Sequence, residues 1–231
     1  MGGLGEALGL PELALGGAPG AGRGAEVARR GAAAGPNAPR PPSPPPPLPG
    51  AAAPGRRLGA LWGLGWRAGA AGGAVGAGGA DYRRAVAALR SWEQTDIGWV
   101  RVQRGGEHLS EGAPVCIEAR LLPGLWVLLP LAVSSVGRPT TGRLRQGPTR
   151  GGGRRWGFTH RTVGRHLLAG EESFAVAWDG SPGGAVEFEV SSVARPAHPL
   201  ASLGAPFVRA FQWKFRRDVA HRMRRAVREA R

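Results

Sequence analysis

Residues 206–228 read PFVRAFQWKFRRDVAHRMRRAVR, and this stretch decides the fold. Its apolar residues recur at three- and four-residue spacing, which places them on one helical face. They are Phe207, Val208, Phe211, Phe215, Val219, Met223 and Val227. Arginines lie away from this stripe and crowd the C-terminal turns, where the helix dipole favours cations. We therefore expect a long amphipathic helix whose apolar stripe belongs to the core. A helix lying on a membrane surface is the alternative.

Upstream of this helix, apolar residues alternate with polar ones at a period of two, which is typical of half-buried strands. The predicted strands are Trp99–Val102, Pro114–Leu121, Leu125–Val136, a strand from Trp156, Glu171–Asp179 and Ala185–Val193. The last two flank the turn sequence DGSPGG and are expected to form a hairpin. Ahead of all these strands, the apolar residues follow a helical spacing from Asp81, which can cap the helix. This helix carries Tyr82, Ala85, Val86, Leu89 and Trp92 on one face.

The order of elements is thus a helix, about six antiparallel strands and a long C-terminal helix. An amphipathic helix after such a meander must cover one face of the sheet. We predict an α+β fold in which a curved antiparallel sheet grips the C-terminal helix, a helix-grip fold like that of the START and Bet v 1-like superfamily. Folds of this kind often leave an apolar cavity between sheet and helix.

Three further segments follow from composition. Residues 1–57 are rich in glycine, alanine and proline, and are predicted to be a disordered tail. Residues 58–80 are ambiguous, with an edge strand as one interpretation. A single domain is predicted over residues 81–231, interrupted at residues 137–155 by a mobile loop rich in arginine and glycine.

Charge, cysteine content and hydropathy limit the partners and the cellular compartments that fit this chain. The formal net charge is +15, almost all of it from arginine, so the chain will attract polyanions at low salt. Cys116 is the only cysteine; it excludes an intramolecular disulfide and is expected to be a buried structural thiol. The longest apolar run, residues 121–133, is too short and too broken by prolines to span a bilayer. We expect a cytoplasmic protein, or an organellar one if the tail is a transit peptide.

A resemblance to a known family lies in the most polar part of the chain. The stretches WGFTHRTVGRHLLAGEESF at Trp156–Phe174 and ARPAHPLASLGAPFVRAFQ at Ala194–Gln212 resemble the uncharacterised domain-of-unknown-function family nineteen-ninety, found in actinobacteria and plants. The resemblance covers about residues 76–228. The family usually reads FGYGTLxGHxxxGEExF; this chain departs from it at His160, Arg161 and Arg165, where the family has Tyr, Gly and Gly. The resemblance implies a fold and no established activity.

Two sets of residues are candidates for a functional site. His166 with Glu171 or Glu172 could form a catalytic acid–base pair, because imidazole titrates near neutrality and a carboxylate can orient it. The structural alternative is that His166 caps a turn and the glutamates are surface charges. Candidate ligand-binding residues are Thr162, Arg195, His198, Trp126 and Trp178. A rigid corner is the structural alternative for His198. A metal site of His160, His166 and His198 with a glutamate lacks tight ligand spacing, and we predict no metal and no cofactor.

The leading functional hypothesis is a soluble protein that binds an apolar or amphipathic small molecule between the sheet and the C-terminal helix. The alternatives are an enzyme that uses a His/Glu acid–base pair, or nonspecific binding of polyanions through the basic loop and helix. No specific nucleic-acid partner is expected, because the basic segments lack interleaved exposed aromatic residues. The sequence does not indicate the oligomeric state.

Overall fold

The structure, a computed structural model, describes residues 12–37, 65–104, 106, 108–141 and 153–230. The helices are α2 (Ala21–Ala34), α3 (Gly78–Arg90), α4 (Pro199–Leu203) and α5 (Ala205–Glu229), with a 3₁₀ turn at Glu93–Thr95. The strands are β1 (Glu12–Leu15), β2 (Arg67–Ala77), β3 (Val100–Arg104), β4 (Pro114–Leu122), β5 (Leu125–Val136), β6 (Arg154–Thr162), β7 (Leu168–Trp178) and β8 (Ala185–Pro196).

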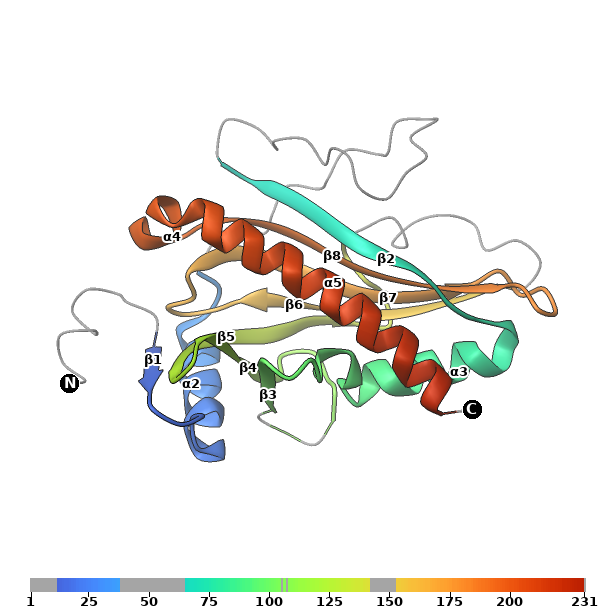
Figure 1. The fold of residues 1–231 in the computed structure, drawn as a ribbon, viewed down its shortest axis with the longest axis horizontal. Coiled ribbons are helices and arrows are strands. Elements are labelled where there is room, and N and C mark those ends of the chain that lie inside the picture. Colours follow the sequence, from blue (N-terminus) through green and yellow to red (C-terminus); the bar gives the residue numbers. More distant parts are fainter. Residues whose placement is uncertain (1–11, 38–64, 105, 107, 142–152, 231) are drawn as a thin grey trace.

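These strands form one antiparallel sheet in the order β2-β8-β7-β6-β5-β4-β3. The short β1 pairs with the first residues of β5. The sheet curves behind α5, which crosses it from α4 to the end where α3 lies (Figure 1). The predicted helix-grip α+β fold is confirmed by this arrangement. The described strands number eight rather than about six, because β1 and β2 join the predicted ones.

The core lies between the inner face of the sheet and the helices α3 and α5. Alternate residues of the strands point into it, as the period of two predicts. Buried members include Val115, Ile117, Ala119, Val127, Leu131, Val133, Phe158, Phe174, Val176, Val186, Phe188 and Val190. Phe158, Phe174 and Phe188 are fully buried. The part of the sheet around Phe158, Phe174 and Phe188 is therefore closed by aromatic packing.

The apolar stripe of α5 is buried unevenly along the helix. Val219, Met223 and Val227, in its second half, are fully buried. Phe211 and Phe215, in its first half, are only half-buried, and Phe207 is 79% exposed. The expectation that the whole stripe is core is therefore wrong for Phe207. The cause is that the sheet curves away from the first turns of the helix and leaves space there.

The domain begins earlier than residue 81. Residues 67–77, within the segment that the sequence left ambiguous, form β2, which pairs along its length with β8 at the end of the strand order. In the described sheet, β2 is thus an edge strand. Glycines in β2 allow close approach: a Cβ at Gly69 would lie 2.8 Å from the guanidinium carbon of Arg216 on α5.

The N-terminal segment contradicts the prediction of a disordered tail over residues 12–34. Helix α2 packs on the outer face of the sheet against β4 and β5. The residues of α2 that face the sheet are small, and most of the apolar surface comes from the sheet, where Cys116, Trp126 and Leu128 are buried with Val27 and Ala28. Composition hid this helix because small residues allow close approach without contributing much hydrophobic area of their own. Residues 1–11 and 38–57 of the predicted tail lie outside the described residues.

Cys116 illustrates how well this outer layer is closed. The thiol is fully buried beneath α2, and burial raises its pKa to about 12. The prediction of a buried structural thiol is confirmed.

Most of the predicted loop, residues 142–152, lies outside the described residues, and with it most of the basic segment considered for nucleic acid.

Two glycines of α2 provide a matched test of its packing. A Cβ at Gly31 would lie 2.6 Å from Cβ of Pro130, whereas a Cβ at Gly22 would meet nothing within 4 Å. We expect Gly31→Ala to lower the free energy of unfolding by about 1–3 kcal/mol through overpacking. Gly22→Ala should raise it by up to about 1 kcal/mol, because alanine favours helix. Urea unfolding measures both, and the reactivity of Cys116 with a thiol reagent should rise only in Gly31→Ala. Equal stabilities would contradict the close contact of α2 with β5.

Candidate functional site

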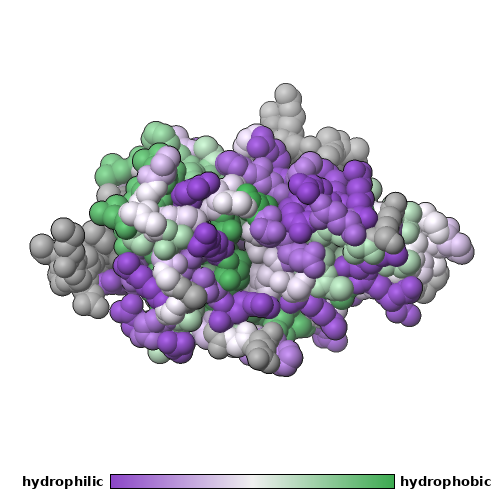
Figure 2. All heavy atoms as spheres, turned by 60° about the horizontal axis from the view of Figure 1, so that its bottom comes forward, coloured by the Kyte–Doolittle hydropathy of each residue, from purple (hydrophilic) through white to green (hydrophobic). Residues whose placement is uncertain are grey.

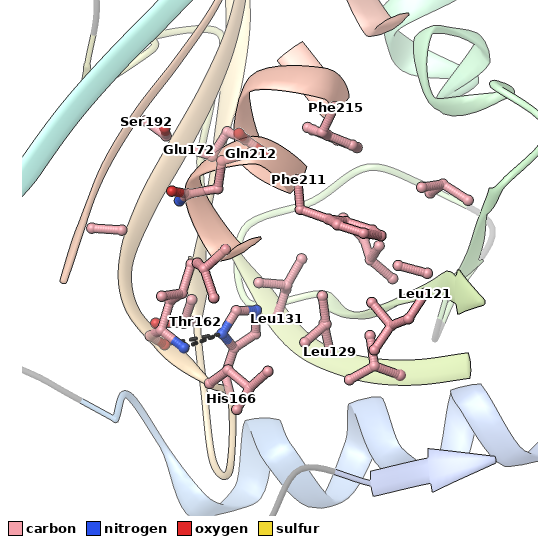
Figure 3. Close-up of a pocket in the computed structure, with 18 of the residues that line it drawn as sticks. Leu121, Leu129, Leu131, Thr162, His166, Glu172, Ser192, Phe211, Gln212 and Phe215 are labelled. Carbon is pink, nitrogen blue, oxygen red and sulfur yellow. Dashed lines mark hydrogen bonds between the residues drawn. The ribbon is translucent and has the colours of Figure 1, made fainter. Parts of the chain in front are cut away.

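A cavity of about 540 Å³ lies between the inner face of the sheet and the first half of α5. Strands β4 and β5 supply its apolar floor, and α5 supplies Phe211 and Phe215 from the other side (Figure 3). The apolar lining residues are Trp99, Val100, Ile117, Ala119, Leu121, Leu122, Leu125, Val127, Leu129, Leu131, Leu167, Leu168, Ala194, Phe207, Val208, Phe211 and Phe215. The size and the apolar lining are those of small-molecule sites.

The mouth of the cavity carries exposed apolar side chains. Leu122, at the β4–β5 turn, is 62% exposed, and Phe207 on α5 is a second exposed lining residue. Leu203 of α4, next to the lining residue Gly204, is also exposed. Hydrophobic residues gather at this end of the molecule in Figure 2, beside a largely hydrophilic remainder. The cavity is therefore open toward an apolar rim.

Polar residues enter the cavity from one row of the sheet. His160 on β6 is directly opposed by Glu172 on β7, and Glu172 by Ser192 on β8. All three line the cavity, and His160 Nε2 lies 3.6 Å from Glu172 Oε2. Figure 3 shows Glu172, Ser192 and Gln212 of α5 at the same end of the cavity. We call His160, Glu172 and Ser192 the polar row.

The electrostatics of the polar row follow from its burial. Burial lowers the pKa of His160 to about 3, so the ring is neutral at pH 7. Burial raises the pKa of Glu172 to about 7, although the guanidinium of Arg216 lowers it in part. Arg216 of α5 donates to Ser192 Oγ at 3.1 Å. A carboxyl that titrates near neutrality inside a cavity is a frequent property of functional sites.

His166 has a different environment from the one that a catalytic pair requires. It lines the cavity from the β6–β7 connection, but its Nδ1 lies 3.0 Å from both the backbone nitrogen and the carbonyl oxygen of Leu168 (Figure 3). Burial lowers the pKa of His166 to about 4, a shift that the bond to Leu168 partly offsets. The histidine that opposes Glu172 is His160, which the sequence considered only as a metal ligand.

Glu171 and Thr162 line the cavity, but their side chains have other partners. Glu171 Oε2 accepts from Thr140, which also contacts Thr159 on the outer face of the sheet. Thr162 Oγ1 donates to Asn37 Oδ1 at 2.6 Å and accepts from the backbone of Gly170 at 2.9 Å. Asn37 also donates to the carbonyl of Leu168. The segment that follows α2 therefore fixes the cavity wall.

Four predicted ligand-binding residues are not among those that line the cavity. Trp126 is buried on the outer face under α2, with Arg101 and Arg120 over its ring. Trp178 packs near Tyr82 at the far end of β7. Arg195 lies over the ring of Trp66, again on the outer face. His198 immediately precedes α4, and its carbonyl accepts from the backbone of Ala201. Strand parity or distance places these four side chains away from this cavity, and a role for them in ligand binding stays a prediction.

A metal centre is not supported either. Within the described ranges, no three histidine, cysteine, aspartate or glutamate side chains are grouped in a way that could hold a metal ion. His198 is separate from the cavity that His160 and His166 line.

Comparison with known proteins places the chain in a family. A family model described as "Domain of unknown function (DUF1990)" matches residues 53–222, most of the chain. The chain belongs to the DUF1990 family. This confirms the resemblance seen in the sequence, and it extends the matched region to include β2. Family membership assigns no activity to DUF1990 proteins.

Relatives of this DUF1990 chain occur in distant organisms. A UPF0548 protein of Arabidopsis thaliana is 35% identical over 144 residues, which are 62% of this chain and 64% of the relative. A UPF0548 protein of Dictyostelium discoideum is 32% identical over 158 residues, 66% of this chain and 69% of the relative. The match thus spans less than two thirds of the Arabidopsis protein.

Two solved structures are similar to the DUF1990 chain at low identity. One is Ara h 8.0201, 10% identical with a TM-score of 0.40, covering 69% of this chain and 98% of that one. The other is an uncharacterized protein from Rhizobium leguminosarum, 13% identical with a TM-score of 0.38, covering 71% and 95%. The fold assignment rests on the strand order and on α5, without these likenesses. Among the described helices, none has the length and hydrophobicity to cross a membrane.

Proposed function

We propose that this protein binds an apolar or amphipathic small molecule in the cavity between its sheet and the first half of α5. The supporting observation is the cavity itself, about 540 Å³ of space with an almost entirely apolar lining. Protein interiors normally pack without voids larger than a water molecule. An apolar space of this size inside a sheet-and-helix core is best explained by a ligand that fills it.

The open mouth supports the same function. Leu122 and Phe207 line the entrance and expose most of their surface. Exposed apolar surface that is continuous with a cavity marks a path for an apolar molecule, because contact with the ligand removes that surface from water. The closed end carries the polar row, which suits a molecule with one polar group.

The test uses the uncharged fluorescent probe N-phenyl-1-naphthylamine. We expect saturable binding with a dissociation constant on the order of micromolar. Ala119→Phe and Ala194→Phe place a ring in the cavity from β4 and from β8 respectively, and each should weaken probe binding at least about ten-fold. Ala210→Phe, on the exposed side of α5, adds the same ring outside the cavity and should leave binding unchanged.

Circular dichroism and thermal unfolding establish that each variant is folded. Because the two cavity variants lie on different strands, a folding defect in one leaves the other to decide. Probe binding that survives both substitutions in folded protein, or no saturable binding by the unsubstituted chain, would overturn the proposal.

A second candidate function is general acid–base catalysis, favoured by one observation. Glu172 has a pKa of about 7 and faces His160 in a cavity that could hold a substrate. The pair is His160 with Glu172, not His166. Metabolite mixtures incubated with the protein and with Glu172→Gln would test it: a compound consumed only by the former supports catalysis, and no consumption of any compound opposes it.

A further inference from the structure

The polar row interrupts an otherwise apolar inner face. One step deeper along β6, β7 and β8, the directly opposed residues are Phe158, Phe174 and Val190, all fully buried. At the next inward-facing position toward the mouth stand His160, Glu172 and Ser192. The polar row therefore lies where the cavity ends against the aromatic core. A molecule that fills the cavity from the mouth meets these groups with its inner end.

The ring of His160 has no hydrogen-bond partner among the described residues. Its side chain is 4% exposed, and in the described part of the chain neither ring nitrogen has a hydrogen bond. Its ring is held among aromatic neighbours, 6.1 Å from that of Trp92 and 5.5 Å from that of Phe174. An unsatisfied buried polar group costs about 1–3 kcal/mol. A ligand group that bonds to the imidazole would remove this cost.

The charges around His160 balance. Burial keeps His160 itself neutral at pH 7. The carboxyl of Glu172 lies 3.6 Å away and is the only acid among the polar row. Arg216, which donates to Ser192, supplies the opposite charge from behind the row, where it packs against Gly69. Glu172 and Arg216 compensate each other, so a ligand group of either sign would add a charge that has no unpaired counter-charge at the row. The position therefore favours an uncharged group.

A hydroxyl group has the required capacity. A neutral imidazole offers one acceptor and one donor nitrogen, and a hydroxyl can pair with either. The carboxyl of Glu172 offers further acceptor positions within reach of the same group. A carboxylate ligand only accepts hydrogen bonds, so it cannot pair with the ionised carboxyl of Glu172. An ammonium ligand only donates them, so it leaves the N–H of the His160 ring without an acceptor.

We propose that the polar row binds the hydroxyl head group of an amphipathic alcohol, whose hydrocarbon body occupies the apolar part of the cavity. This inference rests on the proposed ligand-binding function and specifies the chemical class of the ligand. His160 and Glu172 hold the head group, Ser192 and Arg216 position Glu172, and the leucines of β4 and β5 contact the hydrocarbon chain.

The experiment compares three ligands that share a ten-carbon chain. 1-Decanol, decanoate and decylammonium each compete with N-phenyl-1-naphthylamine for the full-length protein at pH 7.5. We expect 1-decanol to bind at least about ten-fold more tightly than either charged ligand. His160→Phe should abolish this preference while the probe still binds, because the aromatic surface remains and the hydrogen-bonding nitrogens do not. His160→Leu serves as a second variant if the first is unstable.

His166→Phe is the matched control, because it removes the cavity's other histidine, whose Nδ1 already bonds to Leu168. It should retain the preference for 1-decanol. Equal or tighter binding of decanoate or decylammonium, or a preference that survives in His160→Phe and His160→Leu, would overturn the head-group assignment. In those cases the probe is still displaced and the proposed function stands. If the probe does not bind at all, the proposed function itself fails.

Discussion

Phe158→Ala is expected to lower the free energy of unfolding by about 3–5 kcal/mol, the largest effect of any single substitution considered for this chain. The side chain is fully buried in the core. Its ring centre lies 4.7 Å from that of Trp92 and 5.1 Å from that of Phe174, so truncation removes aromatic contacts and leaves a void. Urea unfolding followed by tryptophan fluorescence measures the loss.

The same substitution at the mouth of the cavity provides the control. Phe207 is 79% exposed, and Phe207→Ala should change the free energy of unfolding by no more than about 0.5 kcal/mol. Comparable losses in the two variants would show that the aromatic closure behind the polar row does not carry the stability that its burial indicates.

Glu172→Gln is expected to gain stability relative to the unsubstituted chain as the pH rises. Between pH 4.5 and pH 8, the free energy of unfolding of the variant minus that of the unsubstituted chain should increase by up to about 3 kcal/mol. The folded-state pKa of Glu172, about 7, lies above the ordinary value of 4.5. The stability contributed by the protonated carboxyl is therefore fully present below pH 4.5 and is lost as pH rises through 7. Glutamine does not ionise and avoids this loss. Urea unfolding of both proteins from pH 4.5 to pH 8 measures the difference.

The neighbouring groups do not disturb this comparison. Burial lowers the pKa of His160 to about 3 and of His166 to about 4. The contribution of these neutral histidines to the free energy of unfolding is therefore fully present above pH 6.5 and falls as the solution is acidified. Both proteins contain these histidines and Arg216, and the difference between the two isolates Glu172. Glu229→Gln, at the exposed end of α5, is the control and should show no gain at pH 8. Parallel pH profiles for Glu172→Gln and the unsubstituted protein would refute a raised pKa.

Most of the folded framework could be predicted from periodicity. The alternation in residues 114–121 and 125–136 matches β4 and β5, and the spacing of Phe211, Phe215 and Val219 matches α5. These patterns are informative because one face of each element is buried. The pattern could not show where the sheet curves away from the helix, and so it did not predict that Phe207 is exposed.

The site was predicted in part. The same alternation separates Glu172, which shares a face with Phe174, from Glu171, which shares a face with Ser173. It also places His160 on the face of Phe158. Extending the strand pattern to these polar residues would have selected His160 with Glu172 from sequence alone. His166 was favoured instead because it stands near the glutamates along the chain.

Other parts of the site had no signal in the sequence. Asn37 bonds to Thr162 across 125 positions of the chain, from a region whose composition indicates disorder. The buried face of helix α2 carries mostly small residues, whose packing depends on the shape of the surface they meet. Trp126 was assigned to the cavity because of its chemistry, but the parity of β5 turns it to the outer face, against α2.

The uneven burial of α5 bears on how a molecule could enter and leave. The second half of the helix is anchored by Val219, Met223 and Val227, whereas its first half spans empty space. Local opening costs least where packing is sparse, so the amide hydrogens of the first turns should exchange with solvent sooner than those after Val219. A bound molecule would supply the missing contacts and slow that exchange. Entry and release of such a molecule would then require only the first half of α5 to open, while the aromatic core stays folded.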